Sequence, residues 1–434
     1  MLKKNHNQVA DKLQKLLQEN VEEINGWSGF SQRKTKLNAA AFAQVTILGW
    51  LEKPSASLNE LVQSGKRMGL RVSEQGLQAR LNERAVLLLA GIFKASLDRL
   101  RVAQGMEHAI LKRFSAVQIL DSTQVRLPLW LSGEFYHKQR GYSGMKMHLV
   151  FDVLRGHLDA MDMTSAEVPD QACDFPVRMA QADSLWLFDL GYFAQDTLQT
   201  LAQRQAYFVC RLQSQTAVYT PAGERFKLAA FLNTCPDNSV DMDVLLGVKA
   251  HLGVRLVARR VSSQIAQQRR RAAHAKAKKE GYTCSQEYLR LLGWECLLTT
   301  LTDLSLPTLF ALYALRWQIE LLFKAAKSQF HLAQLGHFKP SRLFCQLYAR
   351  LIGLVMALTL TADLRFQHGF ELSFPKAVHL IQFTVHDLLR AIAHHWRGWS
   401  ATIAHLRDDF LLHAPKSKRR KSPSALARLL SLNP

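Results

Sequence analysis

The residue types with the most chemical potential lie in one segment, residues 313–327, with the sequence YALRWQIELLFKAAK. A helix turns about 100° per residue, so one helix over this segment would place its four chemically active side chains within an arc of about 60°. These are Tyr313, Arg316, Glu320 and Lys327. A carboxylate, two cations and a phenol on one helix face suit a metal ion together with the phosphates of a nucleic acid.

Two further acids stand where short apolar strands are predicted to end. Residues 116–121 (AVQILD) end in Asp121, and residues 185–189 (LWLFD) end in Asp189. Strand ends at the open edge of an α/β sheet are where such folds bind ligands, so we expect both acids to meet Glu320. Divalent cations relieve the repulsion among three carboxylates. Oxygen ligands select hard ions, which favours Mg²⁺, with Mn²⁺ as a workable substitute.

The spacing Y-x2-R-x3-E-x6-K, preceded in order by LDST (residues 120–123) and FDLGY (residues 188–192), resembles the signature of a family of bacterial insertion-sequence transposases. These are the cut-and-paste DDE transposases of the insertion sequence "four" type, with a Y-R-E-K motif. The resemblance implies that Asp121, Asp189 and Glu320 are catalytic and hold two metal ions, with Asp121 bridging both.

The remaining polar and aromatic residues of the segment fit the same chemistry. Tyr313, Arg316 and Lys327, assisted by Lys324, suit contacts with phosphates near the scissile bond. The family often cuts the second strand through a hairpin, which requires a stacked, unpaired base. Trp294 and Trp317 are the candidates for that stacking, with ordinary packing as the alternative for both.

The predicted elements around these residues indicate an α/β protein. Three strands, a helix, a strand, a helix and a strand follow one another over residues 116–211, which is the order of a ribonuclease-H-like catalytic core. We expect a mostly β insertion domain to interrupt that core, with helical regions at both ends. The predicted domains are a DNA-binding region (1–108), the first part of the core (109–211), the insertion (212–292), the second part of the core (293–340) and a C-terminal region with a basic tail (341–434).

Composition points to a polyanionic partner. The 434 residues carry a formal net charge of +21, which favours nucleic acid or an anionic membrane surface. The most apolar run, residues 351–362, is shorter than the roughly 20 residues of a membrane span. No signal peptide opens the chain, and its six cysteines are scattered without a C-x-x-C pair, so we expect a protein of the bacterial cytoplasm without structural zinc.

The N-terminal region contains a pattern compatible with a helix-turn-helix. Residues 57–62 and 73–81 read as two helices around a glycine-containing break, with Ser73 as a helix cap. The second helix would offer Gln75, Gln78 and Arg80 to a groove of DNA, although an ordinary helical bundle fits the same pattern. The basic residues expected to contact DNA are Arg33, Lys34, Lys36, Lys66, Arg67, Arg71, Arg80, Arg269, Arg270 and Arg271.

The sequence therefore predicts a DNA transposase that acts as a homodimer. It would bind double-stranded DNA at the terminal inverted repeats of its element, cleave there and join the 3′-hydroxyl ends to target DNA. One alternative is a metal-dependent nuclease of the ribonuclease-H class that cleaves without joining. The other is a noncatalytic DNA-binding regulator descended from a transposase. Asp152, on the second predicted strand, is a competing acid.

Overall fold

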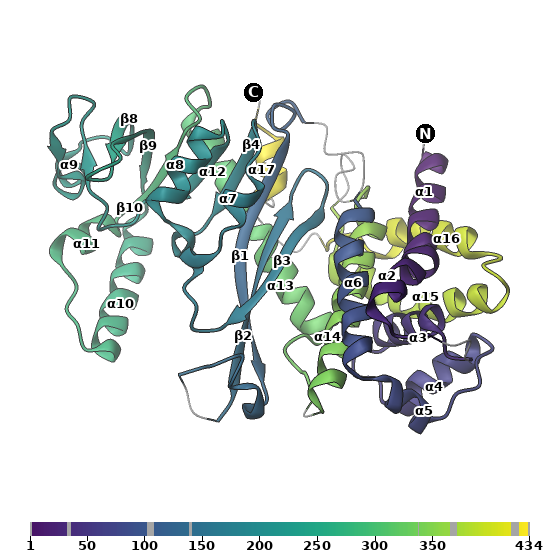
Figure 1. Ribbon diagram of the computed structural model, residues 1–434. Coiled ribbons are helices and arrows are strands. Elements are labelled where there is room, and N and C mark those ends of the chain that lie inside the picture. The colour runs from purple at the N-terminus through teal and green to yellow at the C-terminus, as the bar shows by residue number, and fades with distance from the viewer. Residues whose placement is uncertain are drawn as a thin grey trace. The chain divides into compact units, whose positions relative to one another are not determined.

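The computed structural model describes residues 2–32, 36–101, 108–138, 141–336, 338–364, 371–417 and 425–432. It is a mixed α/β protein with two compact units, each assembled from separate stretches of the chain (Figure 1). The first unit comprises Met1–Met106, Ser122–Val168 and Glu320–Lys421, and the second comprises Glu107–Asp121, Pro169–Ile319 and Ser422–Pro434.

The first unit has a helical core around α14 (Pro340–Thr361), which packs against α3 (Ala39–Glu52) and α6 (Glu83–Arg99). By length and composition α14 could cross a membrane, but 89% of its most apolar stretch is buried inside the protein. Its one buried cation, Arg350, donates from Nε to the carbonyl of Pro54 at 3.0 Å. Burial among other helices accounts for the apolar sequence of α14.

The two helices predicted in the N-terminal region are confirmed, with the predicted cap at Ser73 and a further cap at Ser57. At the start of α4 (Leu58–Arg67), the Ser57 side chain and Glu60 form a capping box. Ahead of α5 (Glu74–Arg80), Ser73 Oγ accepts from the Gly76 N–H at 3.1 Å. The other helices of this unit are α1 (Leu2–Lys15), the π-helix η1 (Leu16–Asn20), α2 (Val21–Ser28), η2 (Leu129–Leu131), α15 (Phe374–Ala393), α16 (Trp399–His413) and most of α13 (Trp317–Gln329).

The strands of the second unit follow the order β1-β4-β5-β10-β9-β8-β6-β7, in which β4 is parallel to both β1 and β5. In the first unit, β2 and β3 form the predicted hairpin, in the order β3-β2-β1. Strand β1 is twice the predicted length and contributes to both units. The strands are β1 (Ala116–Leu127), β2 (Ser143–Asp152), β3 (His157–Ser165), β4 (Ser184–Phe188), β5 (Tyr207–Arg211), β6 (Val218–Tyr219), β7 (Arg225–Phe226), β8 (Ser239–Leu246), β9 (Leu252–Arg260) and β10 (Trp294–Thr299).

Short helices connect the strands of the second unit, and α8 and α12 both pack on β5. Where a helix was predicted over residues 170–183, the chain forms only η3 and the five-residue α7. The helices of this unit are η3 (Asp170–Ala172), α7 (Phe175–Met179), η4 (Leu190–Tyr192), α8 (Gln195–Gln203), α9 (Leu228–Thr234), α10 (Ser263–Glu280), α11 (Gln286–Leu291), α12 (Leu306–Ala314) and α17 (Ala425–Leu430).

Residues 212–292, predicted to be mostly β, contain both helices and strands. Among them, strands β8 and β9 continue the sheet through β10, which pairs with β5 on its other side. The basic run in this range forms the 18-residue helix α10, because Ala, Arg, Gln and Lys all favour a helix. Strands β8 and β9 are joined by a turn that begins at Gly247, whose φ of 83° favours glycine.

Candidate functional site

Strand pairing brings two of the three predicted acids together in the second unit. Leu120 of β1 pairs with Phe188 of β4, and the next residue of each strand is Asp121 and Asp189. Neighbouring strands lie about 4.8 Å apart, so the two carboxylates leave the same edge side by side. Strand β1 continues past Asp121, so the acid stands where the pairing with β4 ends and not at the strand end that was predicted.

Each carboxylate accepts a hydrogen bond that orients it. Arg316 Nη1 donates to Asp121 Oδ2 at 2.9 Å. The two side chains are only 15% and 19% exposed, so solvent screens this ion pair weakly. Asp189 Oδ1 accepts from the N–H of Leu190 at 2.7 Å and caps the short helix η4. A cation already compensates the negative charge of the pair of acids.

The phenol of Tyr313 completes this cluster. Its hydroxyl is buried and has no hydrogen-bond partner among the described residues. Burial, followed by the charge of Asp189, raises the pKa of Tyr313, while the charges of Arg316 and Arg211 act in the opposite direction. The guanidinium carbon of Arg316 lies 6.0 Å from the Tyr313 ring centroid.

Arg211 is a cation that the sequence analysis missed. It is the last residue of β5, the strand that lies parallel to β4, and it is close enough to lower the pKa of Tyr313. Its position at a strand end was the available signal, because the same reasoning found Asp121 and Asp189.

The prediction of one helix over residues 313–327 is wrong. Helix α12 ends at Ala314 and α13 begins at Trp317. In the break, the N–H of Leu315 donates to Leu312 O at 3.0 Å and that of Gln318 donates to Leu315 O at 2.8 Å. Bonds of this i to i+3 type turn the chain by about 120° per residue. The angles calculated for a straight helix therefore do not hold across the break.

Glu320 lies in the first turn of α13, on the first-unit side of the boundary, together with Lys327. The two are seven residues apart within one helix and so still share a face. Across the described ranges, no group of three or more His, Cys, Asp and Glu side chains is arranged to hold a metal ion. The meeting of Glu320 with the two aspartates stays a prediction.

The two tryptophans proposed for base stacking differ in exposure. Trp294 is 5% exposed, and the guanidinium carbon of Arg260 lies 4.5 Å from its ring centroid. Trp317 is 54% exposed at the start of α13. Only Trp317 presents its ring to solvent, where a base could stack on it without prior rearrangement.

The predicted basic residues divide by their contacts. Arg67 pairs with Glu52 at 2.5 Å. Arg80 lies over the Phe30 ring at 4.0 Å and donates to the Phe30 carbonyl at 3.0 Å, which ties it to its own helical core. Arg33 and Lys34 lie outside the described residues. The exposed members are Lys36, Lys66, Arg71, Arg270, Arg271 and Lys324, while Arg269 and Lys327 are half-buried.

Asp152, the competing acid, has a structural partner. It is fully buried in the β2–β3 hairpin, where Arg155 pairs with it at 2.5 Å and the N–H of Leu154 donates to it at 2.8 Å. Burial raises the pKa of Asp152, with the neighbouring Asp159 adding to the effect. These bonds assign Asp152 to the turn of the hairpin.

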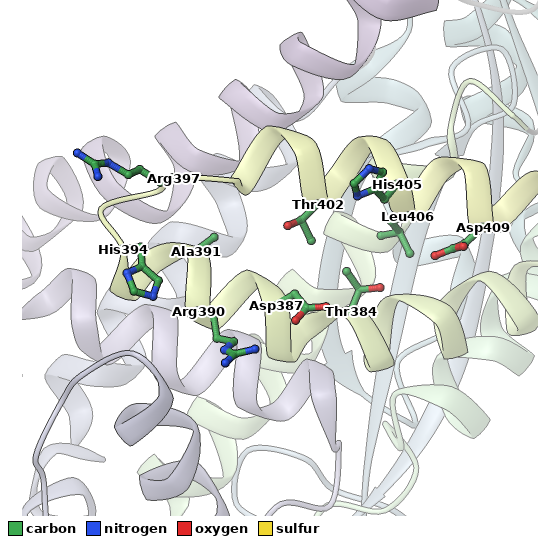
Figure 2. Close-up of a pocket in the computed structure, with 10 residues that line it drawn as sticks. All are labelled: Thr384, Asp387, Arg390, Ala391, His394, Arg397, Thr402, His405, Leu406 and Asp409. Carbon is green, nitrogen blue, oxygen red and sulfur yellow. The ribbon is translucent and has the colours of Figure 1, made fainter.

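A cavity of about 490 Å³ lies between α15 and α16 of the first unit, and none of the predicted site residues lines it. Figure 2 shows that Asp387 and Arg390 come from one helix and Asp409 from the other. Because its two aspartates balance its two arginines, the cavity does not select an anion. Its lining residues are Thr384, Asp387, Arg390, Ala391, His394, Arg397, Thr402, His405, Leu406 and Asp409.

Comparison with known proteins identifies relatives. Residues 112–356 match the family described as "Transposase DDE domain". The chain is 27% identical over 433 residues to the transposase for insertion sequence element IS231B of Bacillus thuringiensis, covering 92% of this chain and 90% of that protein. It is 26% identical to the transposase for IS1151 of Clostridium perfringens, covering 77% and 76%. A piggyBac transposase synaptic complex with hairpin DNA aligns with a TM-score of 0.48 at 9% identity, covering 94% of this chain and 86% of that chain.

Proposed function

This chain belongs to the family of transposases with a DDE domain, and from that starting point we propose the following reaction. The protein binds the terminal inverted repeats of an insertion sequence, hydrolyses a phosphodiester at each end and joins the 3′-hydroxyl ends to target DNA. The observation that carries the proposal is the position of Asp121 and Asp189 directly after the paired residues Leu120 and Phe188, with Arg316 bonded to Asp121. Family membership alone would not identify these residues.

The acids have the chemistry to hold divalent cations. In our proposal Asp121, Asp189 and Glu320 would hold two Mg²⁺ ions, with Mn²⁺ as a substitute. An all-oxygen donor set suits these hard ions, and the guanidinium on Asp121 indicates that the acids require positive charge beside them. The ions, when bound, would activate a water or a 3′-hydroxyl and stabilise the leaving oxygen.

We assign Glu320 to the site because of its position in the chain. It follows Arg316 by four residues, and Arg316 is already bonded to Asp121. The strand order of the sheet supports the same assignment. The order β3-β2-β1-β4-β5, with β2 and β3 in a hairpin and β4 parallel to its neighbours, fits a ribonuclease-H-like core. We propose that residues 212–292 are an insertion into that core.

The cations around the acids would position the DNA backbone. Arg316 exchanges its carboxylate partner for a phosphate when DNA binds, because its planar fork fits either anion. The unpartnered hydroxyl of Tyr313 donates to a phosphate oxygen. Lys324 and Lys327 extend the contact along α13. Burial lowers the pKa of Lys327, and a phosphate beside it would restore its preference for the charged form.

We propose further that Trp317 stacks on the unpaired base of a hairpin intermediate, because its ring is exposed and that of Trp294 is buried. The helix-turn-helix would meet the repeat through Gln75 and Gln78, with Lys66 and Arg71 on the backbone. Arg80 is excluded from this set by its contact with Phe30. Handling two ends requires a homodimer, and the reaction would take place in the bacterial cytoplasm.

A strand-transfer assay tests the proposal. Purified protein is given Mg²⁺, duplex DNA carrying the ends of its own element, and a supercoiled target plasmid. We expect Asp121→Asn and Asp189→Asn to abolish cleavage and joining while DNA binding persists. Asp152→Asn is the matched control, since it removes a carboxylate that belongs to the hairpin turn. Cleavage at the element ends without joined product would instead identify a nuclease, and full activity of Asp121→Asn would refute the assignment.

A further inference from the structure

Helix α10 (Ser263–Glu280) carries an exposed stripe without acids on one face. At about 100° per residue, five side chains fall within an arc of about 80° along the helix. Each of the five is exposed: Gln264, Gln267, Arg271, His274 and Lys278. The only acid of α10 is Glu280, its last residue. We call these five residues the α10 stripe.

A different face attaches α10 to the second unit. Its buried residues are three alanines, Ala266, Ala273 and Ala277, about 120° around the helix from the stripe. Two of the predicted DNA-binding arginines flank these alanines. Arg269 donates to Trp294 O at 3.3 Å and Arg270 donates to Leu289 O at 3.0 Å. Both arginines therefore hold the helix in place, and the stripe faces outward.

The ends of α10 are fixed independently of any ligand. Ser262 accepts from the N–H of Ile265 at the first turn, and Gly281 ends the helix with a φ of 76°. Figure 1 shows α10 extending away from strands β8, β9 and β10, beside the segment that leads to α11. A rigid helix attached by one side to a sheet leaves the stripe open to a large partner.

We propose that α10 is a DNA-recognition helix that lies in a major groove; this rests on the proposed function, which makes DNA the substrate. The stripe spans about 21 Å along the helix, and a groove about 12 Å wide admits a helix. Gln pairs with adenine, Arg and Lys pair with guanine or phosphate, and no acid on the stripe repels the backbone. Double-stranded RNA is disfavoured, because its major groove is too narrow for side chains to enter.

Two double variants of the full-length protein test this proposal. Arg271→Ala with Lys278→Ala removes two charges from the stripe. Lys276→Ala with Lys279→Ala removes two charges from other faces of the same helix. Alanine favours a helix, so both should fold, and circular dichroism with thermal melting verifies it. The probe is a pool of duplexes with randomised sequence, from which each protein selects bound DNA for sequencing.

We expect the stripe variant to lower the salt dependence of binding by about two in the logarithmic slope, and the Lys276 and Lys279 variant to lower it by less, because those two side chains lie on other faces of the helix. Only the stripe variant should change the selected base preference. A third variant, Gln267→Ala, should leave the salt slope unchanged and reduce discrimination at one base position by about tenfold. Gln267→Ala leaves the net charge of the protein unchanged, so a change in the selected base preference would indicate that Gln267 contacts a base.

Unchanged base preference in both the stripe variant and Gln267→Ala would overturn the proposal and leave α10 as a nonspecific phosphate contact. Binding of an acidic protein in place of duplex DNA would overturn it too. These results differ from failure of the proposed function. In that case the wild-type protein would neither select duplex DNA nor cleave it with Mg²⁺, whatever the state of α10.

Discussion

Arg316 neutralises Asp121 in the protein without metal, and this has a measurable consequence for folding. Arg316 Nη1 donates to Asp121 Oδ2 at 2.9 Å, between side chains that are 15% and 19% exposed. A hydrogen bond to a charged group contributes about 1.5–3 kcal/mol, whereas an exposed ion pair contributes about 0–1 kcal/mol. For Arg316→Ala in EDTA we expect a loss of about 2 kcal/mol, since little solvent reaches the pair.

The assay is thermal unfolding of DNA-free protein in EDTA and in Mg²⁺. A loss of about 2 kcal/mol lowers the melting temperature of a unit of this size by about 4–8 °C. The matched control is Arg113→Ala. Arg113 pairs with Asp303 in the same unit, but these side chains are 33% and 56% exposed, so we expect a loss of about 1 kcal/mol at most and no dependence on Mg²⁺.

Mg²⁺ should act in the opposite direction to the loss of the ion pair in Arg316→Ala. In the wild-type protein an ion must displace the guanidinium from Asp121, and in Arg316→Ala it need not. A cost of about 2 kcal/mol corresponds to about 30-fold tighter Mg²⁺ binding by the variant, because 1.4 kcal/mol is a factor of ten. Mg²⁺ should therefore stabilise the variant more than the wild type. Equal melting in EDTA, or equal stabilisation by Mg²⁺, would refute this account of the pair.

Three further changes follow from the described contacts. Tyr313→Phe removes a buried hydroxyl that has no hydrogen-bond partner among the described residues. The free energy of unfolding should therefore stay the same or rise by up to about 1 kcal/mol, while DNA cleavage falls. Burial lowers the pKa of His157, which bonds to Leu97 O. Because the unfolded chain then binds the proton more readily, the free energy of unfolding should decline as the pH falls below about 6.5. Thermal melting at a series of pH values should show this decline for the wild type and not for His157→Gln. Trp317→Ala should block hairpin formation in a cleavage assay without affecting first-strand nicking or melting, whereas Trp317→Phe should retain it.

The sequence predicted helices and strands well where the signal lies within a few neighbouring residues. The apolar runs ending in Asp121 and Asp189 became neighbouring strands. Side-chain caps at Ser57 and Ser73 marked where two helices begin. Such signals depend on contacts within a few residues, which an amino-acid sequence displays directly. The family of DDE transposases, too, was predicted from the resemblance of three motifs and then confirmed, whereas the Y-R-E-K subtype stays a prediction.

Long-range contacts decided the rest. Nothing in the order of residues shows that Arg316 bonds to Asp121, that Arg80 is held by Phe30, or that the hydroxyl of Tyr313 is left without a partner. Spacing also failed at the break between α12 and α13, because a helical wheel assumes unbroken geometry that packing does not respect. The preference of a segment for helix or strand depends on its neighbouring residues, whereas the partner of a charged side chain depends on which distant segments fold against it.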